Sequence, residues 1–392
     1  LSARGMRILH IGKYYAPERG GIERYLQALA EWNVARGDAV AALVHRRAGR
    51  WRSTCESIGG VEVRRAGCLA APLYTPVSPA FPLQLARALR AFRPDLLHLH
   101  FPNPSCFALL GSPAALRLPW IVHWHADVPP HSPDWRLRTA YRAYRPFERA
   151  VLARAPRVIA TSQPYLDTSA ALVPWRAKTR VIPLGLAQAG TAARARIDPW
   201  PAARGLRLLA VGRLSHYKGF DVLLDALARI ADTSLLLVGR GERERELRAR
   251  ADALGLAHRV AFAGEVDDDA LACAYAGADA LVLPSLDRSE AFGLVLLEAM
   301  RAGLPVVASA IAGSGIASVV ADGRTGLLVP PADADALAQA IGQLRDAPLR
   351  TRLGDAGRAR WREAFTLEAS ARAVQSVYED VRAAAPATAR GD

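Results

Sequence analysis

The sequence predicts an α/β protein with two parallel-sheet domains. Short apolar runs alternate with stretches of helical spacing along most of the chain, which is typical of strands and helices wound into parallel sheets. Residues 184–205 are rich in Ala, Gly and Pro and show little periodicity, so we interpret them as the linker between the domains. A chain of 392 residues contains enough material for two hydrophobic cores.

The expected elements alternate on both sides of this linker. Before it, apolar runs predict strands at residues 7–12, 40–45, 61–64, 96–100, 120–127 and 158–161. Helical spacing predicts helices at 22–34, 83–92, 135–154 and 165–172, the last with Ser162 as its N-cap. After the linker, strands are expected at 208–212, 235–238, 260–263, 280–283, 306–308 and 327–329. The helices there are expected at 220–230, 243–254, 292–301, 333–345, 349–364 and 367–383.

Composition excludes several classes of protein. Half of the residues are apolar and 22% are charged, which indicates a globular chain rather than a disordered one. No apolar run reaches the roughly 18 residues of a membrane span, and residues 1–5 lack the apolar core of a signal peptide. The four cysteines have no metal-like spacing, which fits a reducing cytosol.

The positive charge is concentrated in the first half of the chain. Residues 1–200 contain 28 Lys and Arg against 12 Asp and Glu, a net charge of +16, whereas residues 201–392 carry a net charge of −2. Such a basic half attracts nucleic acid, anionic lipid or a phosphorylated substrate. Because the chain has only three lysines, a GC-rich genome that favours arginine is the alternative explanation.

Two segments of this half combine arginines with aromatic residues. In the helix expected at 135–154, Trp, Tyr and Phe are interleaved with arginines, and residues 46–52 combine four arginines with Trp51. Both patterns fit a lipid surface, and the second also fits nucleic acid. A core helix with a charged outer face also explains residues 135–154, and a solvated loop also explains residues 46–52. For each segment, binding to a surface and a purely structural role both stay open.

Two carboxylates mark residues 280–310, where two strand candidates flank a loop and a helix start. Glu290 lies in the loop, and Glu298 interrupts an otherwise apolar helix. Ligands bind at the carboxyl ends of parallel strands, and the free N–H groups of a helix start suit a phosphate or a sugar hydroxyl. A carboxylate in such apolar surroundings needs hydrogen-bond donors, which ribose hydroxyls or an arginine would supply to Glu298. Alternatively, Glu298 is solvated on an exposed face of the helix.

Arg213 and Lys218 stand five residues apart between a strand and a helix. The pair suits a diphosphate, because Arg binds phosphate oxygens in a fork and Lys acts as a point charge. Gly20 and Gly21 stand in a similar context, where small residues let a diphosphate approach a helix N-terminus, although such a pair is also typical of plain turns. The Gly-Arg-Gly at 239–241 lacks the third glycine of a dinucleotide signature.

His123 and His125 end the strand expected at 120–127 and point to the same face. Together with His98 and His100 they suggest a metal, but the pairs lie on separate strands without the spacing of metal ligands, so we predict no metal site. His125 and Asp127 stand at the end of this strand, where a purely structural role is one explanation. The family resemblance described below implies another, in which a neutral imidazole orients a sugar hydroxyl, with His125 as the main candidate of this half and Asp127 as a second one.

These segments together resemble retaining glycosyltransferases of family GT4, which have the GT-B fold. The resemblance is clearest in E-A-F-G-L-V-L-L-E at residues 290–298, which is similar to the family's E-x7-E signature. Further similar segments are G-R-L-S-H-Y-K-G at 212–219, G-G-I-E at 20–23, V-H-W-H-A-D at 122–127 and T-S-Q-P-Y-L at 161–166. The resemblance thus covers nearly the whole chain.

The resemblance implies two Rossmann-like domains that face a central cleft. Residues 1–184, with a final helix at about 366–392 that crosses back, would bind the acceptor, and residues 185–365 would bind the nucleotide sugar. No metal or cofactor would be needed, because cationic side chains would neutralise the leaving diphosphate.

The resemblance also implies roles for individual residues. The donor sugar and its phosphates would contact the loop formed by Glu290, Ala291, Phe292, Gly293 and Leu294, and Glu298 would bind the ribose. The diphosphate would be held by Arg213, Lys218, Gly20 and Gly21, and the nucleobase would lie near Arg240 and Val266. The catalytic residues would be His125, Glu290, Arg213 and Lys218, with His125 and Asp127 on the acceptor side.

The same resemblance suggests the substrates. The segments G-R-L-S-H-Y-K-G-F-D, H-F-P-N-P, H-A-D and A-G-S-G look most like bacterial mannosyltransferases of polysaccharide assembly. These enzymes use GDP-mannose and polyprenyl-diphosphate-linked acceptors, so we expect a cytoplasmic protein at the inner face of the plasma membrane with no nucleic-acid partner. A UDP-sugar-dependent GT4 enzyme, a GT-B-shaped sugar-nucleotide epimerase and a non-catalytic membrane or nucleic-acid binder are the alternatives.

Overall fold

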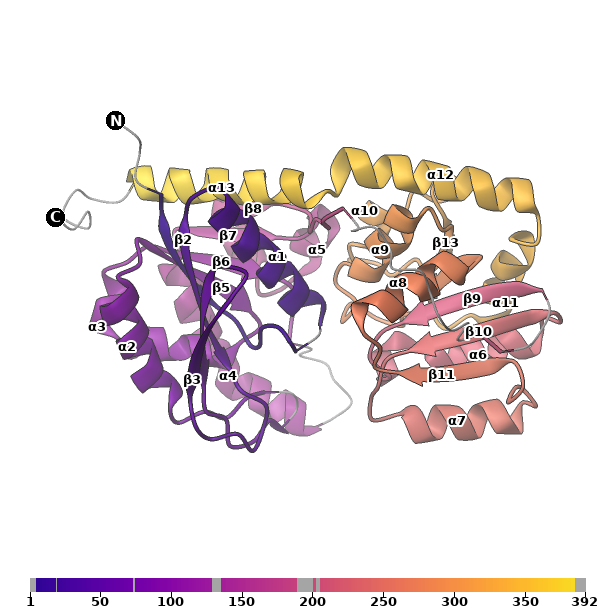
Figure 1. The fold of residues 1–392 in the computed structure, drawn as a ribbon, viewed down its shortest axis with the longest axis horizontal. Coiled ribbons are helices and arrows are strands. Elements are labelled where there is room, and N and C mark those ends of the chain that lie inside the picture. Colours follow the sequence, from indigo (N-terminus) through magenta and orange to yellow (C-terminus); the bar gives the residue numbers. More distant parts are fainter. Residues whose placement is uncertain are drawn as a thin grey trace. The chain divides into compact units, whose positions relative to one another are not determined.

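The structure, a computed structural model, describes residues 5–18, 20–72, 75–128, 135–188, 200–201 and 205–384 (Figure 1). The chain forms two compact units. The first unit comprises residues 1–185 together with 367–392, and the second comprises residues 186–366. The boundaries expected from the sequence differ from these by one residue. Most of the expected linker lies outside the described residues.

The first unit is built on an eight-stranded sheet with the order β3-β4-β2-β1-β5-β6-β7-β8. Its strands are β1 (Arg7–Ile11), β2 (Ala39–His45), β3 (Thr54–Ile58), β4 (Val61–Ala66), β5 (Leu96–Phe101), β6 (Trp120–Trp124), β7 (Arg157–Ala160) and β8 (Thr179–Val181). All neighbours pair in parallel except β3 and β4. The chain order reverses between β1 and β5, and α/β proteins bind ligands at such a switch point.

The helices of this unit pack against its strands or against one another. They are α1 (Gly21–Ala35), α2 (Phe81–Phe92), α3 (Pro113–Leu116), α4 (Trp135–Arg154), α5 (Gln163–Thr168) and α13 (Leu367–Ala384), with 3₁₀ helices at Pro104–Gly111 and Val173–Lys178. The last helix packs against the first, since the hydroxyls of Tyr25 and Ser370 lie 2.9 Å apart. The C-terminal segment thus completes the first unit.

The second unit has a six-stranded, fully parallel sheet with the order β11-β10-β9-β12-β13-β14. The strands are β9 (Leu206–Val211), β10 (Thr233–Val238), β11 (Val260–Gly264), β12 (Ala280–Leu283), β13 (Val306–Ser309) and β14 (Leu327–Val329). The helices are α6 (Phe220–Ala228), α7 (Glu244–Ala253), α8 (Asp268–Gly277), α9 (Leu294–Ala302), α10 (Ile316–Val319), α11 (Ala334–Gln343) and α12 (Ala347–Ala364), with a 3₁₀ turn at His216–Lys218. Here the order reverses between β9 and β12.

Three local differences from the sequence-based expectations have physical causes. β3 was not expected, because its side chains are almost all exposed and it pairs with β4 through its backbone. α8 was not expected either, although Asp267 caps it by accepting from the Ala270 N–H at 2.8 Å. β6 ends at Trp124 rather than at residue 127, so His125 and Asp127 follow the strand instead of belonging to it.

Candidate functional site

The loops that follow β9 and β12 meet at the switch point of the second unit. Lys218 lies in the loop after β9 and Glu290 in the loop after β12, and both side chains are more than nine-tenths buried. Nζ of Lys218 donates to Oε2 of Glu290 at 2.6 Å, and Oγ of Ser285 donates to the same oxygen at 3.0 Å. A buried ion pair therefore occupies the position where parallel sheets bind their ligands.

The ion pair keeps Lys218 charged. Burial by itself would lower the pKa of Lys218, but the attraction of Glu290, assisted by Tyr217, outweighs burial and raises that pKa. Arg213, which the sequence pairs with Lys218, is about one-third exposed and lies 3.3 Å from a carboxylate oxygen of Glu242. The first loop thus presents two cations, as the sequence predicts, and each has a carboxylate neighbour.

A glycine makes the contact between the two loops possible. Gly219 has φ +64°, and a Cβ at this position would lie 2.1 Å from the carbonyl oxygen of Pro284. The N–H of Leu286 also donates to the carbonyl of Tyr217 at 2.8 Å. Only a residue without a side chain lets the Lys218 loop approach the Glu290 loop this closely.

Helix α9 begins directly after the Glu290 loop. Gly293, at φ +79°, is its N-cap residue, and no side chain caps the helix, so the N–H groups of its first turn face the loop. Ser314 donates to the carbonyl of Glu290, and the Gly315 N–H donates to the carbonyl of Ala291 at 2.7 Å. The turn at 313–315 therefore holds the backbone that precedes this helix start.

Glu298 lies in α9 and is 5% exposed. The hydroxyl of Tyr275, from α8, donates to Oε2 of Glu298 at 2.6 Å. The structure thus supplies a donor for Glu298 that sequence reasoning did not find, because it did not predict α8. The three acidic residues at 267–269, before an apolar run, are the signal that would have revealed this helix start.

Arg240 and Val266 follow the neighbouring strands β10 and β11. The Gly239 N–H donates to the carbonyl of Gly264 at 2.8 Å, and a Cβ on Gly264 would lie 3.4 Å from Nε of Arg240. The candidates Arg213, Lys218, Arg240, Val266 and Glu290 therefore all stand at the carboxyl edge of one sheet, within the second unit.

The other candidates belong to the first unit. Gly20 is the N-cap residue of α1 and Gly21 its first residue, as the sequence predicts for a helix start. Asp127 is held in place by its neighbours, since Oδ1 accepts from Nε1 of Trp124 at 2.9 Å and from Oγ of Ser169 at 2.7 Å. These contacts fix the chain directly after β6.

His125 is one of five histidines that the first unit buries together. The members are His10, His98, His100, His123 and His125, from β1, β5, β6 and the residue after β6. The rings of His123 and His125 are stacked with centroids 4.4 Å apart, which confirms that they point to one face. Burial lowers the pKa of His125 to about 3, so the ring is neutral at pH 7. The sequence analysis overlooked His10, whose place opposite His98 only strand register reveals.

Known proteins share both the sequence pattern and the fold. The family model described as "Glycosyl transferases group 1" matches residues 205–346, and "Glycosyl transferase 4-like domain" matches residues 20–185. The D-rhamnosyltransferase WbpZ of Pseudomonas aeruginosa is 35% identical over 368 residues, which are 92% of each chain. The O-antigen chain mannosyltransferase C of Escherichia coli is 29% identical over 382 residues, 95% of this chain and 98% of that one.

A solved structure agrees with these relatives. Sucrose-phosphate synthase from Thermosynechococcus elongatus superimposes with a TM-score of 0.80 and 28% identity, covering 96% of this chain and 99% of the other. The two parallel-sheet units and the switch-point loops are those of a GT-B glycosyltransferase. The chain therefore belongs to the GT4-like group 1 glycosyltransferases and is a hexosyltransferase of that family.

Proposed function

We propose that the protein is a retaining, metal-independent enzyme that transfers mannose from GDP-mannose to a polyprenyl-diphosphate-linked glycan during polysaccharide assembly. The observation that carries the proposal is the buried Lys218–Glu290 pair at the switch point of the second unit. The activities of two relatives, a D-rhamnosyltransferase and an O-antigen chain mannosyltransferase, support a mannose-type donor and a polysaccharide product.

In this proposal, Lys218 and Arg213 stabilise the diphosphate as it leaves. The bond from the sugar C1 to the phosphate oxygen breaks, the bond from C1 to the acceptor oxygen forms on the same face, and the acceptor proton passes to the departing phosphate. Negative charge grows on the diphosphate during this step, and two cations already in place lower its energy without reorganisation. Glu290 keeps Lys218 charged and in position until the donor binds.

The N–H groups at the start of α9 and the carboxylate of Glu298 bind the rest of the donor. A helix N-terminus without a side-chain cap suits phosphate oxygens or sugar hydroxyls. Glu298 accepts from Tyr275 and is buried, so a ribose hydroxyl that donates to it forms a charge-assisted hydrogen bond. This geometry suits any nucleoside diphosphate sugar, and binding measurements select the base.

Calorimetry with GDP, UDP and ADP tests the donor. We expect GDP to bind most tightly, and Glu298→Ala to raise its Kd by about 10- to 100-fold, because a hydrogen bond to a charged group contributes about 1.5–3 kcal/mol. Glu148→Ala is the matched control, since Glu148 is an equally buried carboxylate of the first unit. If UDP binds most tightly, the assignment of mannose as the donor sugar is wrong, whereas the fold and mechanism are unaffected. If no nucleotide binds, the proposed donor site is contradicted.

The exposed part of α4 supports contact with an anionic membrane. Trp135 and Phe147 are 63% and 52% exposed. A cavity of about 560 Å³ is lined by Tyr141, Arg142, Arg145, Pro146 and Arg149. Exposed aromatic rings beside arginines suit the headgroup region of a bilayer, and we propose that this face places the enzyme at the inner surface of the plasma membrane. Among the described helices, none combines the length and apolar composition of a membrane crossing.

Vesicle sedimentation tests this surface. Replacing Arg142, Arg145 and Arg149 together with Gln is expected to lower binding to phosphatidylglycerol vesicles about 100-fold, because each arginine near an anionic surface contributes about 1 kcal/mol. The control replaces three exposed arginines of the second unit, Arg324, Arg352 and Arg362. Equal loss in both variants would show a general charge effect, and unchanged binding of the α4 variant would refute the proposed surface.

A further inference from the structure

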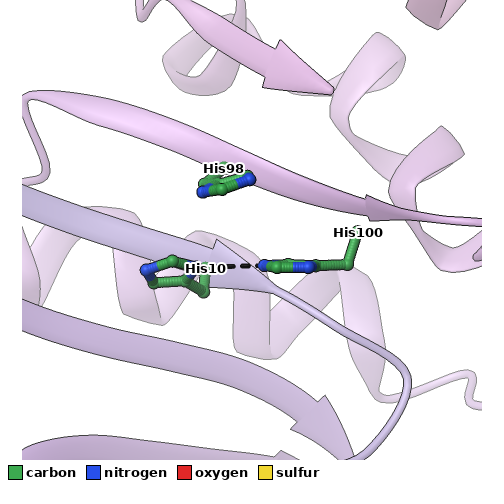
Figure 2. Close-up of side chains that lie close together, drawn as sticks. All are labelled: His10, His98 and His100. Atoms are coloured by element: carbon green, nitrogen blue, oxygen red, sulfur yellow. Dashed lines mark hydrogen bonds between the residues drawn. The ribbon is translucent and has the colours of Figure 1, made fainter. Parts of the chain in front are cut away.

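Three buried imidazoles lie in series across neighbouring strands of the first unit. Nδ1 of His10 lies 3.1 Å from Nε2 of His100, and Nδ1 of His100 lies 2.9 Å from Nε2 of His125. Figure 2 shows the first contact as a dashed line, with His98 beside it. This imidazole series (His10, His100, His125) begins at the switch point between β1 and β5 and ends at the candidate His125.

Each ring of the imidazole series carries one hydrogen. Burial lowers the pKa of His10 and His125 to about 3 and that of His100 well below 6.5, so all three are neutral at pH 7. A neutral imidazole has one donor nitrogen and one acceptor nitrogen. Because His100 pairs through both nitrogens, it donates to one neighbour and accepts from the other. The hydrogen bonds therefore run in one direction along the series.

Two tautomeric states follow from this restriction. In the first, His10 donates to His100, His100 donates to His125, and Nδ1 of His125 carries the remaining hydrogen. In the second, the direction is reversed, Nδ1 of His125 is an acceptor, and Nε2 of His10 carries the hydrogen. A change at either end therefore changes the tautomer of all three rings.

Both ends of the series lack a partner. Nε2 of His10 and Nδ1 of His125 are buried and form no hydrogen bond within the described part of the chain. A buried polar atom without a partner costs about 1–3 kcal/mol. A substrate group that forms a hydrogen bond with Nδ1 of His125 would remove that cost. Whether this group donates or accepts the bond would then select one of the two tautomeric states.

The other two histidines of the cluster, His98 and His123, form a separate pair. Nε2 of His98 lies 3.3 Å from Nδ1 of His123, and Nδ1 of His98 lies 2.6 Å from the hydroxyl of Tyr378. His98 is stacked on His100 with ring centroids 4.5 Å apart, so it shares the burial of the series. Its hydrogen bonds, however, connect it to His123 and Tyr378 rather than to the series, and this makes His98 a matched control.

The ring planes of His100, His123 and His125 favour hydrogen bonding over metal binding. Nitrogens of His100, His123 and His125 lie within 4.8 Å of one another. Their planes are inclined by only 6° to 15°. Imidazole lone pairs lie in the ring plane, so near-parallel rings do not direct three of them at one ion. The short contact between His100 and His125 already uses one nitrogen of each ring.

We infer that His10 and His100 are positioning residues for glycosyl transfer, which act by setting the tautomer of His125. The inference rests on the proposed function and on the role expected for His125 from the sequence, namely that its ring orients a sugar hydroxyl. A hydroxyl that donates to Nδ1 of His125 needs the second state, and a phosphate oxygen at the same place needs the first. His10 maintains the required state from the far side of β5, although it does not touch the substrate.

Nitrogen-15 NMR of the full chain labelled at histidine, without substrate, tests the linkage of the rings. The variant His10→Phe removes one end of the series, whereas His10→Asn places an amide near the position of Nδ1, where it can donate or accept. We expect the populations of the two His125 tautomers to be the same in the wild type, in His10→Asn and in the control His98→Phe, and to change in His10→Phe. Unchanged His125 tautomer populations in His10→Phe would overturn the inference.

Kinetics with the nucleotide sugar that calorimetry selects test the role in transfer. We expect kcat to fall about tenfold in His10→Phe and to recover to within about threefold of wild type in His10→Asn, while His98→Phe keeps wild-type kcat despite a lower Tm. An equal fall in His98→Phe would overturn the positioning role. An inactive wild type would instead contradict the proposed function, and the NMR result would stand independently.

Discussion

Lys218→Ala is expected to lower kcat by about 10²- to 10³-fold, the usual effect of removing one preorganised group that stabilises charge in a transition state. The side chain is buried, and its charge is maintained by Glu290 at 2.6 Å. In the low-dielectric surroundings of a buried site, one cation beside a departing diphosphate stabilises it far more than in water. Single-turnover rates with saturating donor measure this effect directly.

Two further variants separate this chemical effect from a loss of stability. Lys218→Gln keeps a hydrogen-bond donor for Glu290 but lacks the charge, so it is expected to fold better than Lys218→Ala and to be as slow. Lys178→Ala is the control, because Lys178 donates to the carbonyls of Leu152 and Ala155 and has a structural role in the first unit. It should lower Tm and leave kcat unchanged. Folded Lys218→Gln with kcat within threefold of wild type would exclude the proposed role.

The first unit is expected to lose stability steeply between pH 6.5 and pH 5. Its six buried histidines are His10, His45, His98, His100, His123 and His125. Burial lowers the pKa of His10 and His125 to about 3 and that of His45 to about 4, and it lowers the pKa values of the others well below 6.5. In the unfolded chain these histidines have pKa values near 6.5. Below that pH, the unfolded chain therefore binds protons that the folded unit does not.

The sign and size of this effect follow from proton linkage. His10, His45 and His125 each leave stability intact above pH 6.5 and remove about 2 kcal/mol at pH 5, and the other three histidines act in the same direction. Glu148, whose pKa burial raises to about 7, offsets about one of these contributions. The net loss is a large part of the whole stability of a typical domain. The tyrosines that face the cluster, Tyr25 and Tyr378, do not oppose the effect, because burial raises their pKa values further from this range.

Urea unfolding at pH 7.0, 6.0 and 5.5 measures this linkage. The slope of unfolding free energy against pH gives the number of protons taken up, and His98→Phe is expected to reduce it by about one. Replacing His216 and His258, which are exposed in the second unit, with Asn is the control for removing histidines outside the buried cluster. A wild-type stability that is constant from pH 7.0 to 5.5 would contradict neutral burial of the cluster.

Local sequence pattern was sufficient for most of the fold and for placing the candidate donor-side residues at the carboxyl ends of strands. The strand at 280–283 and the helix at 135–154 have the bounds that their apolar spacing predicts, because burial of one face is a short-range property of such segments. Arg213, Lys218 and Glu290 were also found from the sequence, since each follows an apolar strand. Several elements escaped: β3 is largely exposed, α8 was hidden in an alanine-rich run, and α3, α10 and β8 have only three or four residues each.

Long-range pairing was needed for the contacts that give these residues their chemistry. Lys218 and Glu290 are 72 residues apart, and they meet because β9 and β12 are neighbours in the sheet. His10 and His100 are 90 residues apart, and the register of β1 on β5 brings them together. Strand order and register depend on packing of the whole sheet, so hydrophobic spacing specifies each strand but not its neighbour. The buried ion pair and the imidazole series are therefore properties of the assembled sheets.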